Sequence, residues 1–180
     1  MQLNGQPLLT RLCAMLRDVT TCVTIVGSPE KYGSLGVQCV PDQWPGEGPL
    51  GGIITALMNA HSRNHQHTWC LIIGCDMPFL TSEWLAYTME RAFATDNNVI
   101  VPQSEYGLEP LCACWRTSAV GKLQTAFESG VRKITDAMKH LEMEVLDETH
   151  WKRFDSAGRL FWNMNTPADY DDAKGILEAE

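Results

Sequence analysis

Residues 69–80 read WCLIIGCDMPFL, a short apolar run that stops on a lone carboxylate, Asp76. The run is about the length of one strand, and Pro78 prevents the strand from continuing. Because the run is apolar throughout, it predicts a strand buried on both faces, as in a parallel sheet. We therefore expect Asp76 at the carboxyl edge of that sheet, which is where open α/β sheets bind their ligands.

A carboxylate at that edge has two interpretations. It can hold a hard cation such as Mg²⁺, which takes one or two protein oxygens and completes its shell with water and substrate phosphates. It can equally cap the next helix or close a turn, because Asp is common at strand ends for conformational reasons. The stretch by itself leaves both interpretations open.

The rest of the chain alternates between strand-like and helix-like segments. Short runs rich in β-branched and apolar residues predict strands at 22–26, 37–40, 98–102, 111–115 and 143–146. Apolar residues at helical spacing predict helices at 6–18, 49–60, 81–94, 117–128, 133–141 and 167–177. This alternation predicts one α/β domain over residues 1–180, with three layers: a mostly parallel sheet and helices on both of its faces. The loops 27–36, 42–48 and 103–109 follow strands, so they either form a pocket or are ordinary connections.

The composition excludes some classes of protein. The 180 residues carry a net charge of −8 with a pI near 5.1, whereas sequence-independent nucleic-acid binders and proteins that coat anionic membranes need a basic face. No apolar run has the length of a bilayer span, and the first residues lack the charged start and apolar core of a signal peptide. We therefore expect a cytoplasmic protein that binds neither nucleic acid nor membrane.

The seven cysteines are odd in number and lie mostly inside apolar runs, which is typical of reduced, buried thiols rather than of a disulfide framework. On a strand, Cys112 and Cys114 would share one face. A zinc site would need a second pair of ligands, and the pair His65 and His67 lies far away on an apparent loop. Core packing is the favoured interpretation of these thiols.

Four motifs follow one another along the chain: GPLGGI at 48–53, CDMPFL at 75–80, EPL at 109–111 and NMNTP at 163–167. Asp42 precedes the first motif, and a stretch with a glycine and two basic residues, GVRK at 130–133, lies between the last two. In order and spacing, the motifs resemble those of the molybdenum cofactor guanylyltransferases, the MobA-like family, over nearly the whole chain. That family is similar to the wider group of nucleotidyltransferases with a Rossmann-like fold.

The resemblance implies transfer of GMP from GTP to molybdopterin bearing molybdenum, with release of pyrophosphate and a need for Mg²⁺. It also implies other proteins of molybdenum cofactor biosynthesis and apo-molybdoenzymes as candidate partners. By resemblance, Asp76 is the catalytic residue that holds the magnesium ion at the reacting phosphates. The resemblance further implies nucleotide contacts at Ser28, Asp42, Gly48, Pro49 and Leu50, and phosphate or pterin contacts at Arg132, Lys133, Asn163 and Asn165.

Several of these residues also have plain structural interpretations. Asn163 and Asn165 can be turn residues that satisfy the backbone ahead of a helix, although the four motifs together favour the functional role. Arg132 and Lys133 can be a solvated helix start, although a dianionic phosphate needs some cation. Glu109 can simply be exposed, since its place before Pro110 is the one local hint of a role.

Members of the family open with a strand and a glycine-rich loop of the type LAGGxSxRMGxDK, whose backbone N–H groups and cations hold the triphosphate. Residues 2–9 resemble the segment just after that loop. We therefore expect that roughly two dozen residues of the family pattern, the first strand and its loop, are absent from this chain. Their absence would leave sheet edges unpaired and make turnover by this chain weak.

Three other functions stay open. The chain can be a related nucleotidyltransferase that uses CTP for the same pterin or couples a nucleotide to a sugar or polyol phosphate. It can be a non-catalytic protein that holds molybdopterin, in which case pterin binding would need neither nucleotide nor Mg²⁺ and would survive Asp76→Ala. It can also be a domain that needs a partner chain to complete its sheet.

Overall fold

The structure is a computed structural model that describes every residue except 1, 4, 64–68, 156 and 180. The strands are β1 (Gln2–Leu3), β2 (Gln6–Pro7), β3 (Thr24–Val26), β4 (Gln38–Val40), β5 (Trp69–Ile73), β6 (Val99–Ser104), β7 (Gly107–Leu108), β8 (Cys112–Arg116) and β9 (Met143–Leu146). The α-helices are α1 (Leu8–Val19), α2 (Pro29–Tyr32), α3 (Pro49–Arg63), α4 (Ser82–Phe93), α5 (Val120–Glu128), α6 (Ile134–Met138), α7 (Glu148–Trp151) and α8 (Pro167–Ala179). Short 3₁₀ turns lie at Gly33–Leu35, Thr117–Ala119 and Lys152–Phe154.

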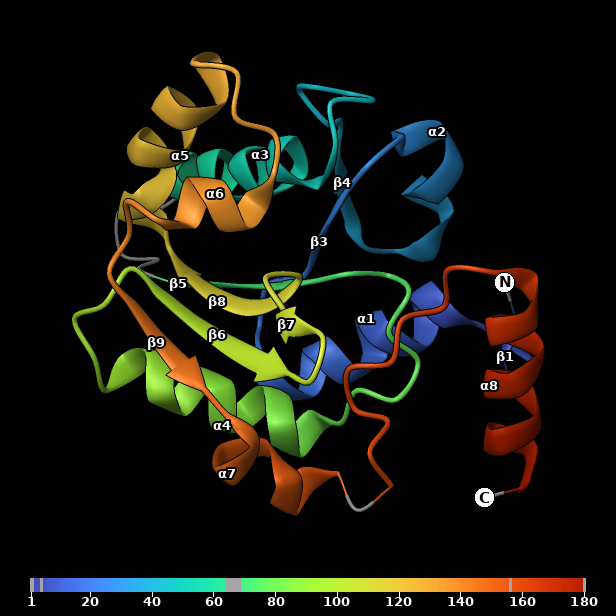
Figure 1. The fold of residues 1–180 in the computed structure, drawn as a ribbon. Helices are drawn as coiled ribbons and strands as arrows, with labels where there is room; N and C mark the ends of the chain where they lie inside the picture. Colours follow the sequence, from blue (N-terminus) through green and yellow to red (C-terminus); the bar gives the residue numbers. More distant parts are fainter. Residues whose placement is uncertain (1, 4, 64–68, 156, 180) are drawn as a thin grey trace.

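The main sheet has the order β5-β8-β6-β7, with β9 beside β6 (Figure 1). Strand β8 is antiparallel to both β5 and β6, and β9 is parallel to β6. It follows that β5, β6 and β9 all run in one direction and end at the same edge, where β8 begins. The expected α/β fold is confirmed, with β8 as a strand of reverse direction inside the sheet.

Strands β3 and β4 form a separate parallel pair, and β1 and β2 form a short antiparallel pair. Figure 1 shows α3, α5 and α6 above the main sheet and α4 with α7 below it, while α8 stands to one side next to the N-terminus. Two helical layers therefore enclose the sheet, as the alternation of segments predicts.

Each face of the sheet has its own apolar core. The upper core joins α3 to α5 and α6 through fully buried side chains that include Ile54, Leu57 and Leu123. The lower core surrounds Trp84 of α4 and takes in both Cys112 and Cys114 of β8. The two thiols share one face of their strand and are buried and free, which confirms the core-packing interpretation for this pair, whereas Cys22 and Cys75 are exposed and do not fit it.

The helix boundaries have local causes. Thr81 caps α4, because its side chain accepts a hydrogen bond from the Trp84 N–H. Ser28 caps α2 in the same way through the Lys31 N–H. Helices α2 and α7 have four residues each, which is too short for helical periodicity, so the sequence pattern shows these segments as loops.

None of the helices in the described part of the chain is both long enough and apolar enough to cross a membrane.

We predict that Ile54→Ala lowers the free energy of unfolding by about 3 kcal/mol, because the truncation leaves a cavity in a well-packed core. Ile54 is 0% exposed and packs between α3 and the sheet. Urea denaturation measures the change. Val145→Ala is the control, because Val145 on β9 is 37% exposed and its truncation should cost less than about 1 kcal/mol. Equal losses in the two variants would contradict the assignment of the upper core.

Candidate functional site

Asp76 lies in the turn that follows β5, at the edge where β5, β6 and β9 end. The ladder between β5 and β8 closes with a hydrogen bond of 2.7 Å from the Gly74 N–H to the Leu111 carbonyl. Met77 directly after Asp76 is 2% exposed and belongs to the lower core. The turn is therefore fixed on both sides of Asp76, and the carboxylate is half-buried at the edge.

Gly74 makes room for the Asp76 carboxylate. A Cβ atom at position 74 would lie 2.6 Å from Asp76 Oδ1, whereas the next contact, with Leu111 Cβ, would be an ordinary 3.5 Å. The carboxylate thus folds back over the glycine, and any side chain there would push it away. Gly74 was not among the residues predicted for the site. Its place between the apolar run and the carboxylate is the signal by which it could have been identified.

A backbone hydrogen bond joins the turn to the C-terminal motif. The Met164 N–H donates to the Asp76 carbonyl oxygen at 2.9 Å, so Asn163 and Asn165 flank a residue that touches the turn directly. Asn163 donates from Nδ2 to the Phe161 carbonyl at a long 3.4 Å. The CDMPFL and NMNTP motifs, about 90 residues apart in sequence, therefore meet at one edge of the sheet.

Asn165 also takes part in the start of α8. Its N–H and that of Thr166 donate to Asp169 Oδ2 at 2.8 and 2.7 Å, and the Asp169 N–H donates back to the Thr166 hydroxyl at 3.2 Å. These backbone hydrogen bonds lower the pKa of Asp169. The backbone of Asn165 is thus used in a helix cap, as the structural interpretation expected, while its exposed side chain is left to the surface.

Glu109 is a second carboxylate at this edge. It is 8% exposed and accepts a hydrogen bond of 2.6 Å from the Ser104 hydroxyl, so the interpretation of Glu109 as simply exposed is wrong. Burial raises its pKa, the Ser104 hydrogen bond opposes that shift, and the negative charge of Asp76 raises it further. Glu109 lies at this edge because β8 runs in the reverse direction, which brings the residues before β8 to the edge where β5 ends.

The loop 42–48 is held against α3 by Asp42. Asp42 Oδ1 accepts hydrogen bonds from the Trp44 N–H at 3.0 Å and from the Thr55 hydroxyl at 3.2 Å. Gly51 in the first turn of α3 allows the close approach, because a Cβ there would lie 3.1 Å from Trp44 Cβ. Asp42 therefore has a structural task in addition to any contact with a nucleotide.

The GPL residues have different surroundings. Gly48 has a φ of 90° and needs the freedom of glycine to lead the loop into the helix. Pro49 is exposed at the first position of α3, whereas Leu50 is 0% exposed and lies in the upper core. Leu50 is thus a core residue, whereas Gly48 and Pro49 are exposed to solvent.

Ser28 lies on the neighbouring β3–α2 loop, where its hydroxyl donates to Glu30 at 2.6 Å. Lys31, three residues after Ser28, is a cation that was not among the predicted site residues. Desolvation raises the pKa of the Cys75 thiol, the Asp76 charge raises it further, and the Lys31 ammonium opposes both. Lys31 is thus close enough to act electrostatically on the Asp76 turn.

Arg132 and Lys133 are placed away from these residues. The Arg132 guanidinium donates to Glu47 at 2.8 Å and to the Phe127 carbonyl at 2.8 Å, and it lies 4.0 Å above the Phe127 ring. Lys133 is exposed directly before α6. The contacts of Arg132 with Glu47 and Phe127 join the loop 42–48 to α5, so this pair borders the loop rather than the Asp76 turn.

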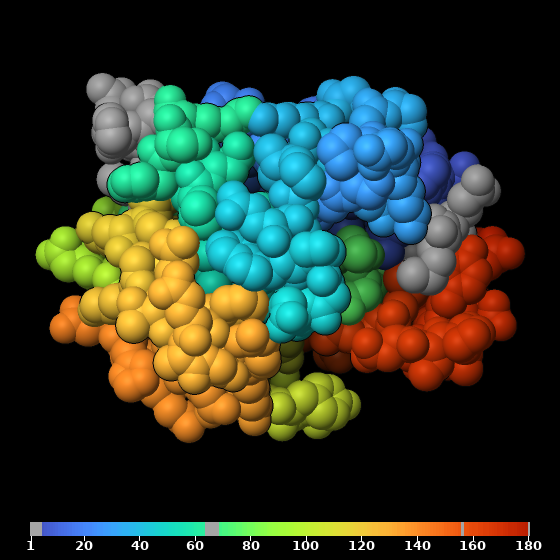
Figure 2. All heavy atoms as spheres, turned by 90° about the horizontal axis from the view of Figure 1, so that it is seen from above, coloured from blue at the N-terminus to red at the C-terminus, as the bar shows by residue number. Residues whose placement is uncertain are grey.

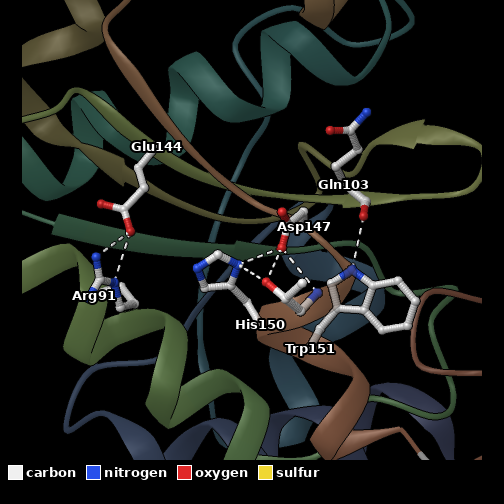
Figure 3. A network of polar contacts seen from close by, with 7 residues as sticks. Arg91, Gln103, Glu144, Asp147, His150 and Trp151 are labelled. Atoms are coloured by element: carbon white, nitrogen blue, oxygen red, sulfur yellow. Dashed lines mark hydrogen bonds and ion pairs between the residues drawn. The ribbon is translucent and has the colours of Figure 1, made fainter.

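Beside the Asp76 turn lies a cavity of about 830 Å³, lined mainly by loop 103–106, α7, Asp155 and the segment 158–162. Figure 3 shows how its rim is fixed: Trp151 Nε1 donates to the Gln103 carbonyl at 2.9 Å, and His150 Nδ1 lies 2.8 Å from Asp147 Oδ1. Next to the rim, Arg91 of α4 is paired with Glu144 of β9 at 2.7 Å. The Trp151 hydrogen bond holds α7 against β6, the His150–Asp147 contact lies within the start of α7, and the Arg91–Glu144 pair joins α4 to β9.

The turn and the cavity touch through Trp162, whose ring stacks on that of Phe79 with centroids 5.4 Å apart. From above, Figure 2 shows green atoms, the colour of residues near 80, at the bottom of a hollow between the blue to cyan loops and the red C-terminal segment. The candidate site is therefore the Asp76 turn with an aromatic cavity at one side, joined to it through the Phe79–Trp162 stack.

The donor set fits a hard divalent cation. Asp76 and Glu109 interact electrostatically, and Asn163 adds an amide beside the same turn. Mg²⁺ needs one or two carboxylates and takes its other oxygens from water and phosphates. Among the residues that the structure describes, no three His, Cys, Asp or Glu side chains gather as a metal site. His65 and His67 lie outside the described residues.

Comparison with known proteins gives one consistent family. The MobA-like NTP transferase domain matches residues 1–143. A protein of Chloroflexus aggregans named "probable molybdenum cofactor guanylyltransferase" is 31% identical over 170 residues, which cover 92% of this chain and 78% of the relative. A protein of Pelotomaculum thermopropionicum with the same name is 29% identical and covers 99% of this chain and 84% of the relative.

Solved structures give the same fold. Molybdopterin-guanine dinucleotide biosynthesis protein A of Archaeoglobus fulgidus superposes with a TM-score of 0.80 at 24% identity, covering 100% of this chain and 90% of that chain. The 2-C-methyl-D-erythritol 4-phosphate cytidylyltransferase of Thermus thermophilus superposes with a TM-score of 0.71 at 15% identity, covering 98% and 92%. With the family match over most of its length, the chain is a nucleotidyltransferase of the MobA-like NTP transferase family.

Proposed function

We propose that the protein transfers GMP from GTP to molybdopterin bearing molybdenum and forms the guanine dinucleotide of the cofactor. The observation that carries the proposal is the Met164–Asp76 hydrogen bond of 2.9 Å, which joins the two motifs whose residues would surround the reacting phosphates. The curated relatives reported above carry the name of this activity. The reaction would take place in the cytoplasm, where GTP is available.

The reaction is a displacement at phosphorus. An oxygen of the terminal phosphate of molybdopterin attacks the α-phosphorus of GTP and forms the new P–O bond. The bond from the α-phosphorus to the oxygen that bridges to the β-phosphate breaks, and pyrophosphate leaves with the electron pair. Most of the catalysis in such a step is positioning and stabilisation of charge on the oxygens.

The residues of the turn have separate tasks in this proposal. The Asp76 carboxylate, held over Gly74, would bind Mg²⁺ together with the phosphates of GTP. Bound there, Mg²⁺ would neutralise charge on the phosphate oxygens. Glu109 would supply a second oxygen ligand, directly or through water; its pKa is raised by burial first and then by the Asp76 charge, and a bound cation would oppose both effects. Lys31, which acts on the same turn, would offset the charge of the triphosphate.

The base and the acceptor would lie on opposite sides of the turn. The proposed contacts to the guanosine are Asp42, Ser28 and the backbone of Gly48, Pro49 and Leu50. Asp42 is the main one of these contacts, because its own hydrogen bonds hold loop 42–48 in place. The aromatic cavity with Trp151 and Trp162 is the proposed pocket for the flat pterin ring. Asn163 and Asn165 would contact the phosphates between the two, and Arg132 with Lys133 would contribute positive charge at the loop.

The second candidate is a cytidylyl transfer on the same site. The observation that favours it is the fold shared with the Thermus thermophilus cytidylyltransferase, at a TM-score of 0.71. In this proposal, a few contacts near Asp42 set the preference for GTP or CTP. Direct comparison of the two nucleotides tests this preference.

We predict that Asp76→Asn lowers formation of the guanine dinucleotide from GTP, molybdopterin bearing molybdenum and Mg²⁺ by about 100-fold or more, because the substitution removes the charged ligand. Liquid chromatography of the product and of pyrophosphate measures the rate. Asp171→Asn on the exposed face of α8 is the matched control and should keep the parent rate. A product formed faster from CTP than from GTP would replace the first candidate with the second, and an unchanged rate in Asp76→Asn would refute both.

We predict that Gly74→Ala weakens binding of Mg²⁺–GTP by about tenfold while the fold is kept, because the added methyl meets the movable carboxylate rather than the backbone. Calorimetric titration measures the binding, and circular dichroism measures the melting temperature. Gly121→Ala in α5 is the matched control, since a Cβ there meets nothing within 4 Å. Parent-like binding by Gly74→Ala would show that the position of the Asp76 carboxylate does not matter.

We predict a pH-dependent effect of Glu109→Gln on stability. The folded-state pKa of Glu109 is raised, so the stability that the neutral acid contributes is present at low pH and is lost as the pH rises through that pKa. Glutamine cannot lose a proton. Relative to the parent chain, Glu109→Gln should therefore be more stable at about pH 8 than at about pH 5 in urea denaturation. The exposed neighbour substitution Glu105→Gln is the control, and the opposite trend in Glu109→Gln would contradict the buried setting.

A further inference from the structure

Loop 42–48 contains a type II turn at 44–47, with the sequence WPGE. The Glu47 N–H donates to the Trp44 carbonyl at 3.1 Å, and Gly46 has a φ of 84° at the third position of the turn. The proline before this glycine fixes the first half of the turn, and the glycine supplies the left-handed residue that the second half requires. The turn therefore ends on Glu47 in a defined place.

The two halves of the loop are held in different ways. Trp44 donates its N–H to Asp42, and its ring packs on that of Phe127 with centroids 5.3 Å apart. Residues 45–49 are all exposed, and Gly48 among them has a φ of 90°. Burial thus fixes the first half, whereas the second half, which leads into α3, needs a side-chain contact to stay in one conformation.

The stretch GVRK provides a fixed cation beside the loop. Gly130, with a φ of 98°, ends α5 in a Schellman motif, and its N–H donates to the Phe127 carbonyl at 3.0 Å. The Val131 N–H completes the motif by donating to the Ala126 carbonyl at 3.0 Å. Arg132 then folds back over the helix end, where its Nη1 donates to the Phe127 carbonyl at 2.8 Å and its guanidinium lies 4.0 Å from the centre of the Phe127 ring. A cation is favoured at the carbonyl end of a helix, so α5 itself fixes the guanidinium.

Glu47 joins the exposed half of the loop to this cation. Its Oε2 accepts a hydrogen bond of 2.8 Å from Arg132 Nε, and the two side chains are 51% and 44% exposed. An ion pair with this exposure adds little to the stability of a whole fold. The contact therefore acts on the position of the loop rather than on the core.

We propose that Glu47 is a positioning residue for the nucleotide, which fixes the backbone at Gly48 and Pro49 by joining the turn to Arg132. This role rests on the proposed function, in which that backbone contacts the guanosine. Without the contact, the nucleotide itself has to order the exposed half of the loop, and this ordering lowers the affinity. Charge alone has the opposite effect, because removal of a carboxylate near a triphosphate favours binding. The sign of the change in affinity thus separates positioning from electrostatics.

Amide hydrogen exchange in the free chain, followed by NMR, tests the contact between Glu47 and Arg132. In Glu47→Ala, the protection factor of the residue 47 amide should fall about fivefold, because the turn opens more often. The amides of Gly130 and Val131 should keep their protection, since α5 fixes them. Unchanged protection at residue 47 would overturn the proposal, because the turn would not depend on the carboxylate.

Calorimetric titration with Mg²⁺–GTP tests the positioning. Glu47→Ala should raise the dissociation constant about fivefold, while the melting temperature and the rate at saturating GTP stay at the parent values. Glu128→Ala is the matched control, because it removes an exposed carboxylate from the end of α5 and should not weaken binding. Unchanged or tighter binding by Glu47→Ala would overturn the proposal. A melting temperature that falls together with the affinity would overturn it as well, because Glu47 would then be a structural residue.

Gly46→Ala disturbs the same turn without changing any charge. A Cβ there would meet nothing within 4 Å, so the φ of 84° is what disfavours alanine. This variant should weaken binding of Mg²⁺–GTP about as much as Glu47→Ala does. The double variant should be no weaker than either single variant, because both substitutions act through one turn. Losses that multiply in the double variant would contradict the proposal.

The same titrations separate this proposal from the proposed function. Product formation by the parent chain together with parent-like affinity in Glu47→Ala would overturn the role of Glu47 alone. If the parent chain uses CTP in place of GTP, the proposed function fails, and the same losses are expected with Mg²⁺–CTP, because the contact fixes backbone rather than a base. Binding of neither nucleotide by the parent chain would overturn both.

Discussion

The antiparallel pairing of β8 between β5 and β6 is the constraint on which the site depends. Because β8 runs against its neighbours, the turn after β5 and the residues before β8 arrive at the same edge of the sheet. That meeting places Asp76 near Glu109, and it gives the Gly74 N–H its partner in Leu111. Both apolar cores then hold the ladder from either face, so the position of the carboxylate is set by the most buried part of the protein.

In the proposed function, the charges at this edge would hold a cation and a polyphosphate. Burial raises the pKa of Glu109 and the nearby Asp76 charge raises it further, and a divalent ion between protein and phosphate oxygens would make this arrangement favourable. Lys31 and the amides at 163 and 165 add donors without adding negative charge. In the proposed function, the aromatic cavity beside the turn would hold the flat pterin ring.

Much of the fold could be predicted from the sequence, because strong apolar runs and helical periods mark β5, α3, α4 and β9. The short helices α2 and α7 and the direction of β8 could not, since four residues carry no period and a strand's sequence does not state its direction. In the site, the lone carboxylate Asp76 could be predicted from the apolar run that ends before Pro78. The roles of Gly74 and Lys31 and the burial of Glu109 could not be predicted, because they depend on contacts between distant segments. Leu50 shows the opposite case, a motif residue whose side chain belongs to the core.

The central claim is that the segments around Asp76, Glu109 and Met164 surround one divalent ion together with a nucleotide. Paramagnetic broadening of backbone amide signals by Mn²⁺–GTP, a substitute for Mg²⁺–GTP, tests this claim most directly. The account predicts broadening that is strongest at residues 74–77, 109–111 and 163–165 and that disappears in Asp76→Asn. Broadening centred elsewhere, or broadening that persists in Asp76→Asn, would contradict it.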